Sequence, residues 1–248
     1  MSHSITKNQH VFPAKSLSRF SGNDRLLDVC INKETGLRKR LLPNNKIFCV
    51  NSHWDQRAES GFGKEIEDSF QDLVDRYIKT GEESPSQDEN DVISNFYALW
   101  HFRSQIKDFD SQHSGSKRAP NNLTDQEKKH LELNHVIYID ETGFIPERMQ
   151  RGIILQGAIM HFRSSNPELE WQLAESTELE LIVPDIPVAL YIPITPKLVL
   201  LAGIKNNKLT RDEVIHANKR CINEANKYFF ASDLEKCGIT EYLAKGNS

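Results

Sequence analysis

The most apolar stretch of the sequence, residues 179–204, constrains the fold more than any other feature because prolines divide it. It carries the charges of Asp185 and Lys197 and several prolines, among them Pro187, Pro193 and Pro196. Because proline lacks a backbone donor and ends a helix, this stretch cannot form one membrane-spanning helix. Proline is tolerated at strand ends, so the segments between the prolines are typical of short buried strands. The strands that we expect in the last third of the chain span residues 169–174, 179–183, 188–192 and 198–202.

The preceding two thirds of the chain predict a hairpin and several helices. Alternating apolar and polar residues on both sides of the turn Lys33–Gly36 indicate a hairpin over residues 25–43. Apolar residues from Ile66 to Ile78 fall on one stripe of a helix that ends at Gly81. Capping boxes begin further helices at Ser86, Thr124 and Thr210, and Pro146 suits the first turn of another. We also expect a strand at residues 136–139 and an exposed loop over residues 108–122.

These elements predict one domain. The 248 residues contain no repeat and no clear linker. We expect an α+β fold with an N-terminal hairpin, central helices, mostly antiparallel C-terminal strands and a closing helix. The predicted domain spans residues 10–233, between a flexible N-terminus over residues 1–9 and a C-terminal tail over residues 234–248.

Composition indicates a cytoplasmic protein with no membrane segment. Residues 1–10 lack the apolar core of a signal peptide, and no stretch is apolar over the length of a bilayer. The cysteines contain no C-x-x-C pair, which argues against a zinc ribbon or a thioredoxin-type site. They lie far apart in the sequence, at Cys30, Cys49, Cys221 and Cys237. We therefore expect reduced thiols.

Charge is distributed unevenly. Residues 64–91 contain ten acidic and three basic side chains, a charge of −7, so the rest of a chain of net charge −4 carries +3. A basic face would favour nucleic acid as a partner through counterion release. Solvated surface charge is the alternative, because the pI of 6.2 lacks the bias of a dedicated nucleic-acid binder. The basic residues gather at residues 38–40, Lys117, Arg118, Arg148, Arg151 and Arg163.

Six polar residues from separate segments are candidates for a common site. They are His10, Glu59, Glu67, Arg103, Asp185 and Asn218. A neutral histidine can transfer a proton near its ordinary pKa of about 6.5, and arginine can hold a phosphate with two hydrogen bonds. Glu67 and Asp185 are the candidate metal ligands, with Mg²⁺ or Mn²⁺ as the candidate cofactor. Glu59 and Glu67 align only if a helix continues through Gly61 and Gly63, which glycine disfavours.

A resemblance to a known family supports the same residues. His10-Val11-Phe12-Pro13, followed by Leu17 and Phe20, resembles the opening signature of bacterial domain-of-unknown-function family 4238. The segments that resemble later elements of this family in the same order contain Phe48, Trp54, Glu59, residues 66–67, residues 102–103, residues 183–188, residues 192–197 and Asn218 with Ala225 and Phe229. Pro184 and Ile186 depart from the family pattern, which has serine and asparagine there. The resemblance implies no mechanism.

The leading function hypothesis is a nucleic-acid-cleaving enzyme of the toxin or phage-defence type, which acts on RNA or single strands and has a protein partner in such a system. An equally weighted alternative is a non-catalytic binding or regulatory module whose polar cluster is structural. Transfer or hydrolysis on a small anion is a third, although a glycine-rich phosphate loop is missing. Solvent access separates the first two, since a catalytic cluster opens into a pocket and a structural one is closed. The sequence leaves the oligomeric state undetermined.

Overall fold

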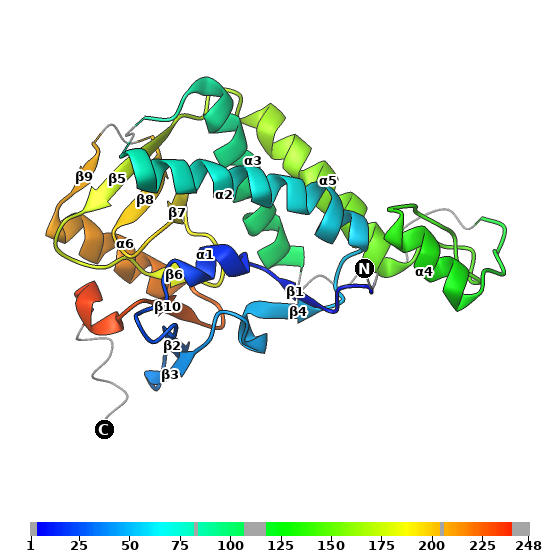
Figure 1. Ribbon diagram of the computed structural model, residues 1–248, viewed down its shortest axis with the longest axis horizontal. Helices are drawn as coiled ribbons and strands as arrows, with labels where there is room; N and C mark the ends of the chain where they lie inside the picture. The colour runs from blue at the N-terminus through cyan, green and yellow to red at the C-terminus, as the bar shows by residue number, and fades with distance from the viewer. Residues whose placement is uncertain (1–3, 82–83, 107–117, 204–205, 240–248) are drawn as a thin grey trace.

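The α+β fold expected from the sequence is confirmed by a computed structural model, which describes residues 4–81, 84–106, 118–203 and 206–239. Figure 1 shows three long helices along one side of the molecule, and the larger sheets with helix α6 on the other. The three helices are α2 (Phe62–Thr80), α3 (Gln87–Ile106) and α5 (Glu147–Ser165). Helix α4 (Asp125–Leu133) lies at the far end of the molecule in this view (Figure 1).

The strands form three sheets, of which the second connects the N-terminal and C-terminal parts of the chain. The first pairs β1 (Asn8–His10) with β4 (Cys49–Asn51). The second has the order β3-β2-β10-β6 and is antiparallel throughout. Its strands are β2 (Leu27–Asn32), β3 (Leu37–Leu41), β6 (Val183–Pro184) and β10 (Phe229–Ala231). The N-terminal hairpin therefore pairs with a C-terminal strand, which closes the domain.

The third sheet has the order β7-β8-β5-β9, and only its β5–β9 pair is parallel. It consists of β5 (Trp171–Ser176), β7 (Tyr191–Pro193), β8 (Leu198–Ala202) and β9 (Lys208–Leu209). Helix α6 (Arg211–Glu224) packs its apolar side, including Val214 and Cys221, into a second core beside this sheet. The short helices are α1 (Ala14–Ser18), η1 (Lys46–Phe48), η2 (Arg57–Gly61) and η3 (Leu234–Cys237).

The helix starts follow the capping signals in the sequence. Thr124 and Thr210 each accept a hydrogen bond from the backbone N–H three residues on, and Glu127 and Glu213 close the two capping boxes. Ser86 and Glu89 form the same reciprocal contact before α3. Each pair satisfies two backbone donors that a helix start leaves unpaired. Local sequence therefore fixes where these helices begin.

The main core lies between the helices and the N-terminal segment. Phe70 of α2 stacks on Phe96 of α3 with ring centroids 3.6 Å apart. Phe12 contacts Phe96 and also lies 4.7 Å from Trp100, centroid to centroid. Burying such rings is a main favourable contribution to folding. The N-terminal segment is thus built into the core of the helical side.

Three of the expected strands differ in the structure, and one of them is residues 188–192, of which only Tyr191 and Ile192 lie in β7. Residues 136–139 form no strand, and Val136 is 45% exposed, so this apolar run lacks a sheet to join. Of residues 179–183, only Val183 belongs to a strand. The Asn218 side chain accepts a hydrogen bond from Ile182 N and donates one to Glu180 O, which replaces the ladder that a strand would form there.

The folded part extends further at both ends than the sequence analysis indicates. Gln9, within the segment expected to be flexible, is buried in β1 and exchanges hydrogen bonds with the backbone of Trp54. Leu234 and Ile239, within the expected C-terminal tail, are fully buried. Hydrogen bonds thus hold Gln9 in the fold, and apolar burial holds Leu234 and Ile239. The rest of the expected tail, residues 240–248, lies outside the described residues.

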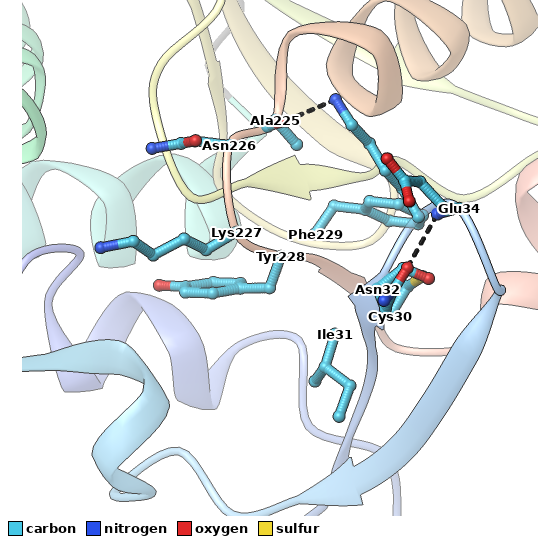
Figure 2. Close-up of a pocket in the computed structure, with 10 residues that line it drawn as sticks. Cys30, Ile31, Asn32, Glu34, Ala225, Asn226, Lys227, Tyr228 and Phe229 are labelled. Carbon is cyan, nitrogen blue, oxygen red and sulfur yellow. Dashed lines mark hydrogen bonds between the residues drawn. The ribbon is translucent and has the colours of Figure 1, made fainter.

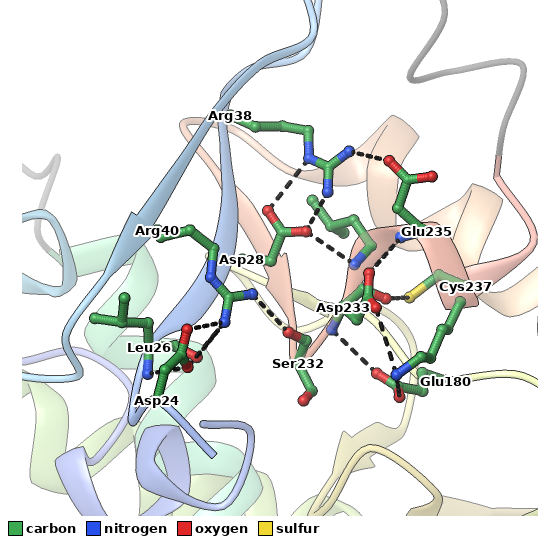
Figure 3. Close-up of polar contacts among 12 residues, drawn as sticks. Asp24, Leu26, Asp28, Arg38, Arg40, Glu180, Ser232, Asp233, Glu235 and Cys237 are labelled. Atoms are coloured by element: carbon green, nitrogen blue, oxygen red, sulfur yellow. Dashed lines mark hydrogen bonds and ion pairs between the residues drawn. The ribbon is translucent and has the colours of Figure 1, made fainter. Parts of the chain in front are cut away.

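A polar network fixes η3 against the hairpin (Figure 3). Asp28 in β2 is 3% exposed; it accepts hydrogen bonds from Arg38 and from Leu234 N at 3.0 Å. Arg38 also donates to Glu235 at 2.8 Å. Glu180 accepts from Asp233 N at 3.1 Å. The contacts of Asp28 and Arg38 with η3 join segments that are more than 190 residues apart in the sequence.

Candidate functional site

Arg103 is the centre of the strongest polar cluster in the candidate set. Its side chain extends from α3 and is 1% exposed. Nη1 donates a hydrogen bond to Glu67, and Nη2 lies 3.4 Å from Ala58 O and 3.9 Å from Glu59 Oε2. The guanidinium also lies over the Trp54 ring, 5.0 Å from its centroid. A buried guanidinium is tolerated because carboxylates, a carbonyl and an aromatic face surround it.

Helical turns on both sides of Gly61 bring the two glutamates to Arg103. Residues 57–61 form a π-helical turn that leads into α2, and Gly61 at the junction has a non-helical backbone, with φ −96° and ψ −118°. Gly61 therefore distorts the helix, as glycine propensity indicates, whereas Gly63 lies within α2. Gly63 is necessary at this point. A Cβ atom there would lie 2.0 Å from Ala58 O and 2.8 Å from Arg103 Nη2. The Ala58 carbonyl and the Arg103 guanidinium therefore occupy the space that a side chain at this position would need.

His10 joins this cluster from β1. Its backbone oxygen accepts a hydrogen bond of 3.5 Å from Arg103 Nη1, and its ring Nε2 lies 3.3 Å from Pro43 O. In the β1–β4 pair it stands opposite Cys49. The structure therefore brings together four of the six candidate residues, namely His10, Glu59, Glu67 and Arg103.

Burial shifts the proton affinities of two members of this cluster in opposite directions. Desolvation lowers the pKa of His10 below 6.5, and neighbouring Arg103 lowers it further. Desolvation raises the pKa of Glu59 above 4.5, although Arg103 and a 2.6 Å hydrogen bond from Trp54 Nε1 oppose this shift. The Glu59 and Glu67 side chains keep 18% and 25% of their surface exposed.

Asp185 has a different environment, next to β10. Both of its carboxylate oxygens accept backbone hydrogen bonds, from Asn226 N at 2.8 Å and from Lys227 N at 3.0 Å. Its own N–H donates to Tyr228 O at 3.0 Å. The residue is 2% exposed. Asp185 thus holds the loop between α6 and β10.

Asn218 is fully buried on α6, and its amide is used completely by the backbone. Its oxygen accepts from Ile182 N at 2.9 Å, and its nitrogen donates to Glu180 O at 2.8 Å and to Cys237 O at 2.9 Å. Three segments are joined by this one side chain. Its contacts are those of a structural residue.

The predicted metal pair does not fit a shared ion. Glu67 faces the Arg103 cation, and Asp185 is occupied by the two backbone N–H groups described above. Within residues 4–81, 84–106, 118–203 and 206–239, no group of three or more histidine, cysteine, aspartate or glutamate side chains is arranged to hold a metal ion.

A second buried polar network, which the sequence analysis missed, lies beside the first. Glu132 of α4 is 4% exposed on its side chain and pairs with Arg148 of α5 at 2.7 Å. Arg148 also donates to Trp54 O at 2.9 Å, and Glu132 accepts from Gln56 N at 3.2 Å. Trp54 thus connects the two networks. The sequence offers little signal for this network. Glu132 is one of several charged residues in α4, and its spacing to Arg148 matches no recognised pattern.

The loop that Asp185 holds lines one side of a polar cavity of about 280 Å³. Figure 2 shows the two segments that line it: residues 30–34, at the end of β2 and in the turn after it, and residues 225–229, before and at the start of β10. Lys33 Nζ donates to Ala225 O at 2.9 Å and to Asn223 O at 3.1 Å, so its charge is engaged at the end of α6. The cavity is lined by backbone and by paired side chains, and it is separate from the Arg103 cluster.

Comparisons with known proteins assign no family. The chain matches no protein-family model, and neither a curated protein nor a solved structure shows significant similarity to it. The resemblance to family 4238 therefore stays a prediction. Among the helices of the described residues, none combines the length and apolar character that crossing a membrane requires.

Proposed function

We propose that this chain is a binding or regulatory module, and that the cluster around Arg103 stabilises its fold. The observation that carries this proposal is the burial of Arg103, whose side chain is 1% exposed and already contacts Glu67, Glu59 and Trp54. A phosphate-binding arginine needs free donors at a surface. Arg103 Nε has no hydrogen-bond partner within the described chain, but it is buried, so a substrate cannot reach it.

The state of the other arginines supports the same proposal. Five arginines of the basic segments each have an acidic partner within 4 Å: Arg38, Arg40, Arg148, Arg151 and Arg163. A basic face for nucleic acid requires cations that release counterions on binding. Paired arginines provide less net charge, and the acidic residues of α2 oppose a polyanion. Solvated and paired surface charge therefore explains the basic residues better than a nucleic-acid interface does.

One observation favours a second candidate function, proton-transfer catalysis at His10 and Glu59 without a metal. Both side chains are only partly buried, and burial moves the pKa of the histidine down and that of the glutamate up. Each pKa therefore shifts toward the range between the two ordinary values, and a group whose pKa lies near the working pH suits general acid–base catalysis. In this alternative Arg103 is a positioning residue, and a nucleic-acid substrate would have to approach two carboxylates.

A cleavage assay separates the two candidates. The wild type and the His10→Ala variant are incubated with labelled RNA, single-stranded DNA and duplex DNA, with Mg²⁺, with Mn²⁺ and with chelator. If the chain is a binding module, the wild type and His10→Ala should show no difference in cleavage of any substrate. Cleavage by the wild type that His10→Ala abolishes, with an unchanged thermal midpoint, would overturn it and establish the catalytic alternative.

A further inference from the structure

An apolar cavity lies at the α4 end of the molecule, beside the run of residues 136–139 that the sequence predicts as a strand (Figure 1). Its volume is about 670 Å³, within the range of small-molecule sites. Leu131 of α4, Ile139 and Ile145 form apolar parts of its wall. We call this cavity the α4 recess. Its size and lining suit the apolar body of a ligand.

The wall of the α4 recess includes apolar side chains that are open to solvent. Val136 and Ile137 are 45% and 38% exposed, and both line the recess. No sheet covers them, because residues 136–139 form no strand. Exposed apolar side chains that gather in one concave place are typical of a binding site. A ligand that covers them gains the free energy of removing this surface from water.

Arg118 is the one charged side chain among the described residues that line the recess. Its backbone N–H donates a hydrogen bond to Gly143 O at 2.9 Å, and Asn121 N donates to Asp140 O at 3.2 Å. These two bonds tie residues 118–121 to residues 140–143 without using the guanidinium. Arg118 is exposed, and its side chain has no acidic partner within the part of the chain that the structure describes. Its positive charge is therefore available to a ligand.

Acidic residues that flank the lining segments in the sequence already have partners. Glu141 pairs with Lys128 at 2.6 Å, and Glu132 pairs with Arg148 at 2.7 Å. Asp140 accepts hydrogen bonds from the backbone of its own turn. The guanidinium at the recess therefore differs from the paired arginines of the other basic segments. An unpaired guanidinium beside an apolar cavity favours a ligand with one negative charge.

We propose that the α4 recess binds a small organic carboxylate with an apolar body, and that Arg118 holds the carboxylate. This inference rests on the proposed binding function and names the ligand class for it. The apolar body would lie against Leu131, Ile137 and Ile145. A guanidinium and a carboxylate can form two parallel hydrogen bonds, which would fix the orientation of the ligand. One cation balances a carboxylate better than a phosphate monoester, whose charge is about −1.5 to −2 at pH 7.

Three probes of equal chain length test the charge preference. Octanoate, 1-octanol and octylammonium share an apolar chain and differ in the head group. Each is titrated into ¹⁵N-labelled full-length protein, and chemical-shift changes are followed by NMR. We expect saturable binding of octanoate, tighter than that of 1-octanol by about fivefold, which is the upper end for an ion pair at an exposed site. Octylammonium should bind most weakly. The shifted resonances should come from residues 118–121 and 136–139.

Two variants, each with a matched control, locate the effect. Arg118→Gln should remove the preference for octanoate and leave the affinity for 1-octanol unchanged. Arg163→Gln removes an exposed arginine on α5 and should bind as the wild type does. Ile137→Asn should reduce binding of both probes, because it places a polar group in the apolar wall. Ile154→Asn, at an α5 residue that is 40% exposed, should leave binding unchanged. The NMR spectrum of each variant reports whether it folds.

Four results would overturn the proposal: no saturable binding of octanoate to the wild type, equal affinity for octanoate and 1-octanol, a preference for octanoate that persists in Arg118→Gln, or binding that Ile137→Asn does not reduce. Octyl phosphate is the fourth probe, and tighter binding of it than of octanoate would overturn the assignment to a carboxylate. These outcomes differ from those of the cleavage assay. Failure of the probes leaves the structural role of Arg103 standing, and His10-dependent cleavage refutes the binding module whatever the probes do.

Discussion

The Arg103 guanidinium and the Tyr191 hydroxyl are both polar groups in an apolar interior, and they differ in the partners that the chain gives them. Around Arg103, two glutamates, a carbonyl and a tryptophan ring come from the same chain. The hydroxyl of Tyr191 is buried and has no hydrogen-bond partner within the described residues. Partners within the chain indicate a stabilising role, whereas a buried hydroxyl without a partner contributes no hydrogen bond to the fold.

The largest effect that we expect comes from removing Arg103. Arg103→Met keeps much of the side-chain volume and leaves Glu67 and Glu59 without their cation. Breaking a buried ion pair in this way costs about 3 to 5 kcal/mol of unfolding free energy. Arg163→Met is the matched control, because Arg163 pairs with Asp91 at the surface, with 43% and 53% of the two side chains exposed. Urea unfolding should show a loss of less than about 1 kcal/mol for the control.

The next effect tests the space that Gly63 leaves for the guanidinium. Gly63→Ala places a carbon too close to Ala58 O and to Arg103, and we expect a loss of about 1 to 3 kcal/mol, as for overpacked cores. Gly157→Ala, which meets nothing within 4 Å in the middle of α5, should gain up to about 1 kcal/mol from helix propensity. Equal unfolding free energies for the two variants would contradict the account of Gly63.

A third pair of substitutions compares a polar group that has partners with one that lacks them. Asn218→Ala removes three hydrogen bonds to the backbone, and unfolding should show a loss of about 1 to 3 kcal/mol. Tyr191→Phe removes a hydroxyl without a partner, so its unfolding free energy should stay within about 0.5 kcal/mol of the wild type. A loss for Tyr191→Phe as large as for Asn218→Ala would show that the hydroxyl has a partner in solution.

The smallest effects concern pH, and their signs are opposite for the two titrating groups. The pKa of folded His10 lies below 6.5, so its stabilising contribution is present above pH 6.5 and is lost as the pH falls through the folded pKa. The advantage of the wild type over His10→Gln should therefore shrink on acidification. The pKa of folded Glu59 lies above 4.5, so protonation favours the folded state. The advantage of the wild type over Glu59→Gln should grow as the pH falls toward 4.5. Urea unfolding between pH 8 and pH 4.5 checks both, and two curves of the same sign would contradict the assigned shifts.

Local patterns predicted most of the fold. The stripe on α2 and the caps of α4 and α6 lie where the sequence indicates, because these signals act within a few residues. Residues 179–183 were predicted as a strand and are not one for most of their length. Their backbone groups bind the Asn218 side chain and the backbone of Pro196 and Lys236, and no local pattern reports contacts with such distant residues.

The candidate site was predicted in part. Four of the six candidate residues meet at Arg103, whereas Asp185 and Asn218 bind backbone groups in other places. The low helix propensity of glycine argued against a helix that aligns Glu59 with Glu67. Propensity cannot show that Ala58 O and the Arg103 guanidinium occupy the space where a side chain of residue 63 would lie. The buried Tyr191 hydroxyl without a hydrogen-bond partner was not predicted, because a missing partner is visible only in three dimensions.

The most direct test of the structural role of the Arg103 cluster is a double-mutant cycle. Unfolding free energies are measured for Arg103→Met, Glu67→Gln and the double variant, and for the corresponding Arg163→Met and Asp91→Asn cycle at the surface. The account predicts a coupling free energy of about 2 kcal/mol or more for Arg103 with Glu67, and at most about 0.5 kcal/mol for Arg163 with Asp91. Equal and small coupling in both cycles would contradict the claim that this cluster stabilises the fold.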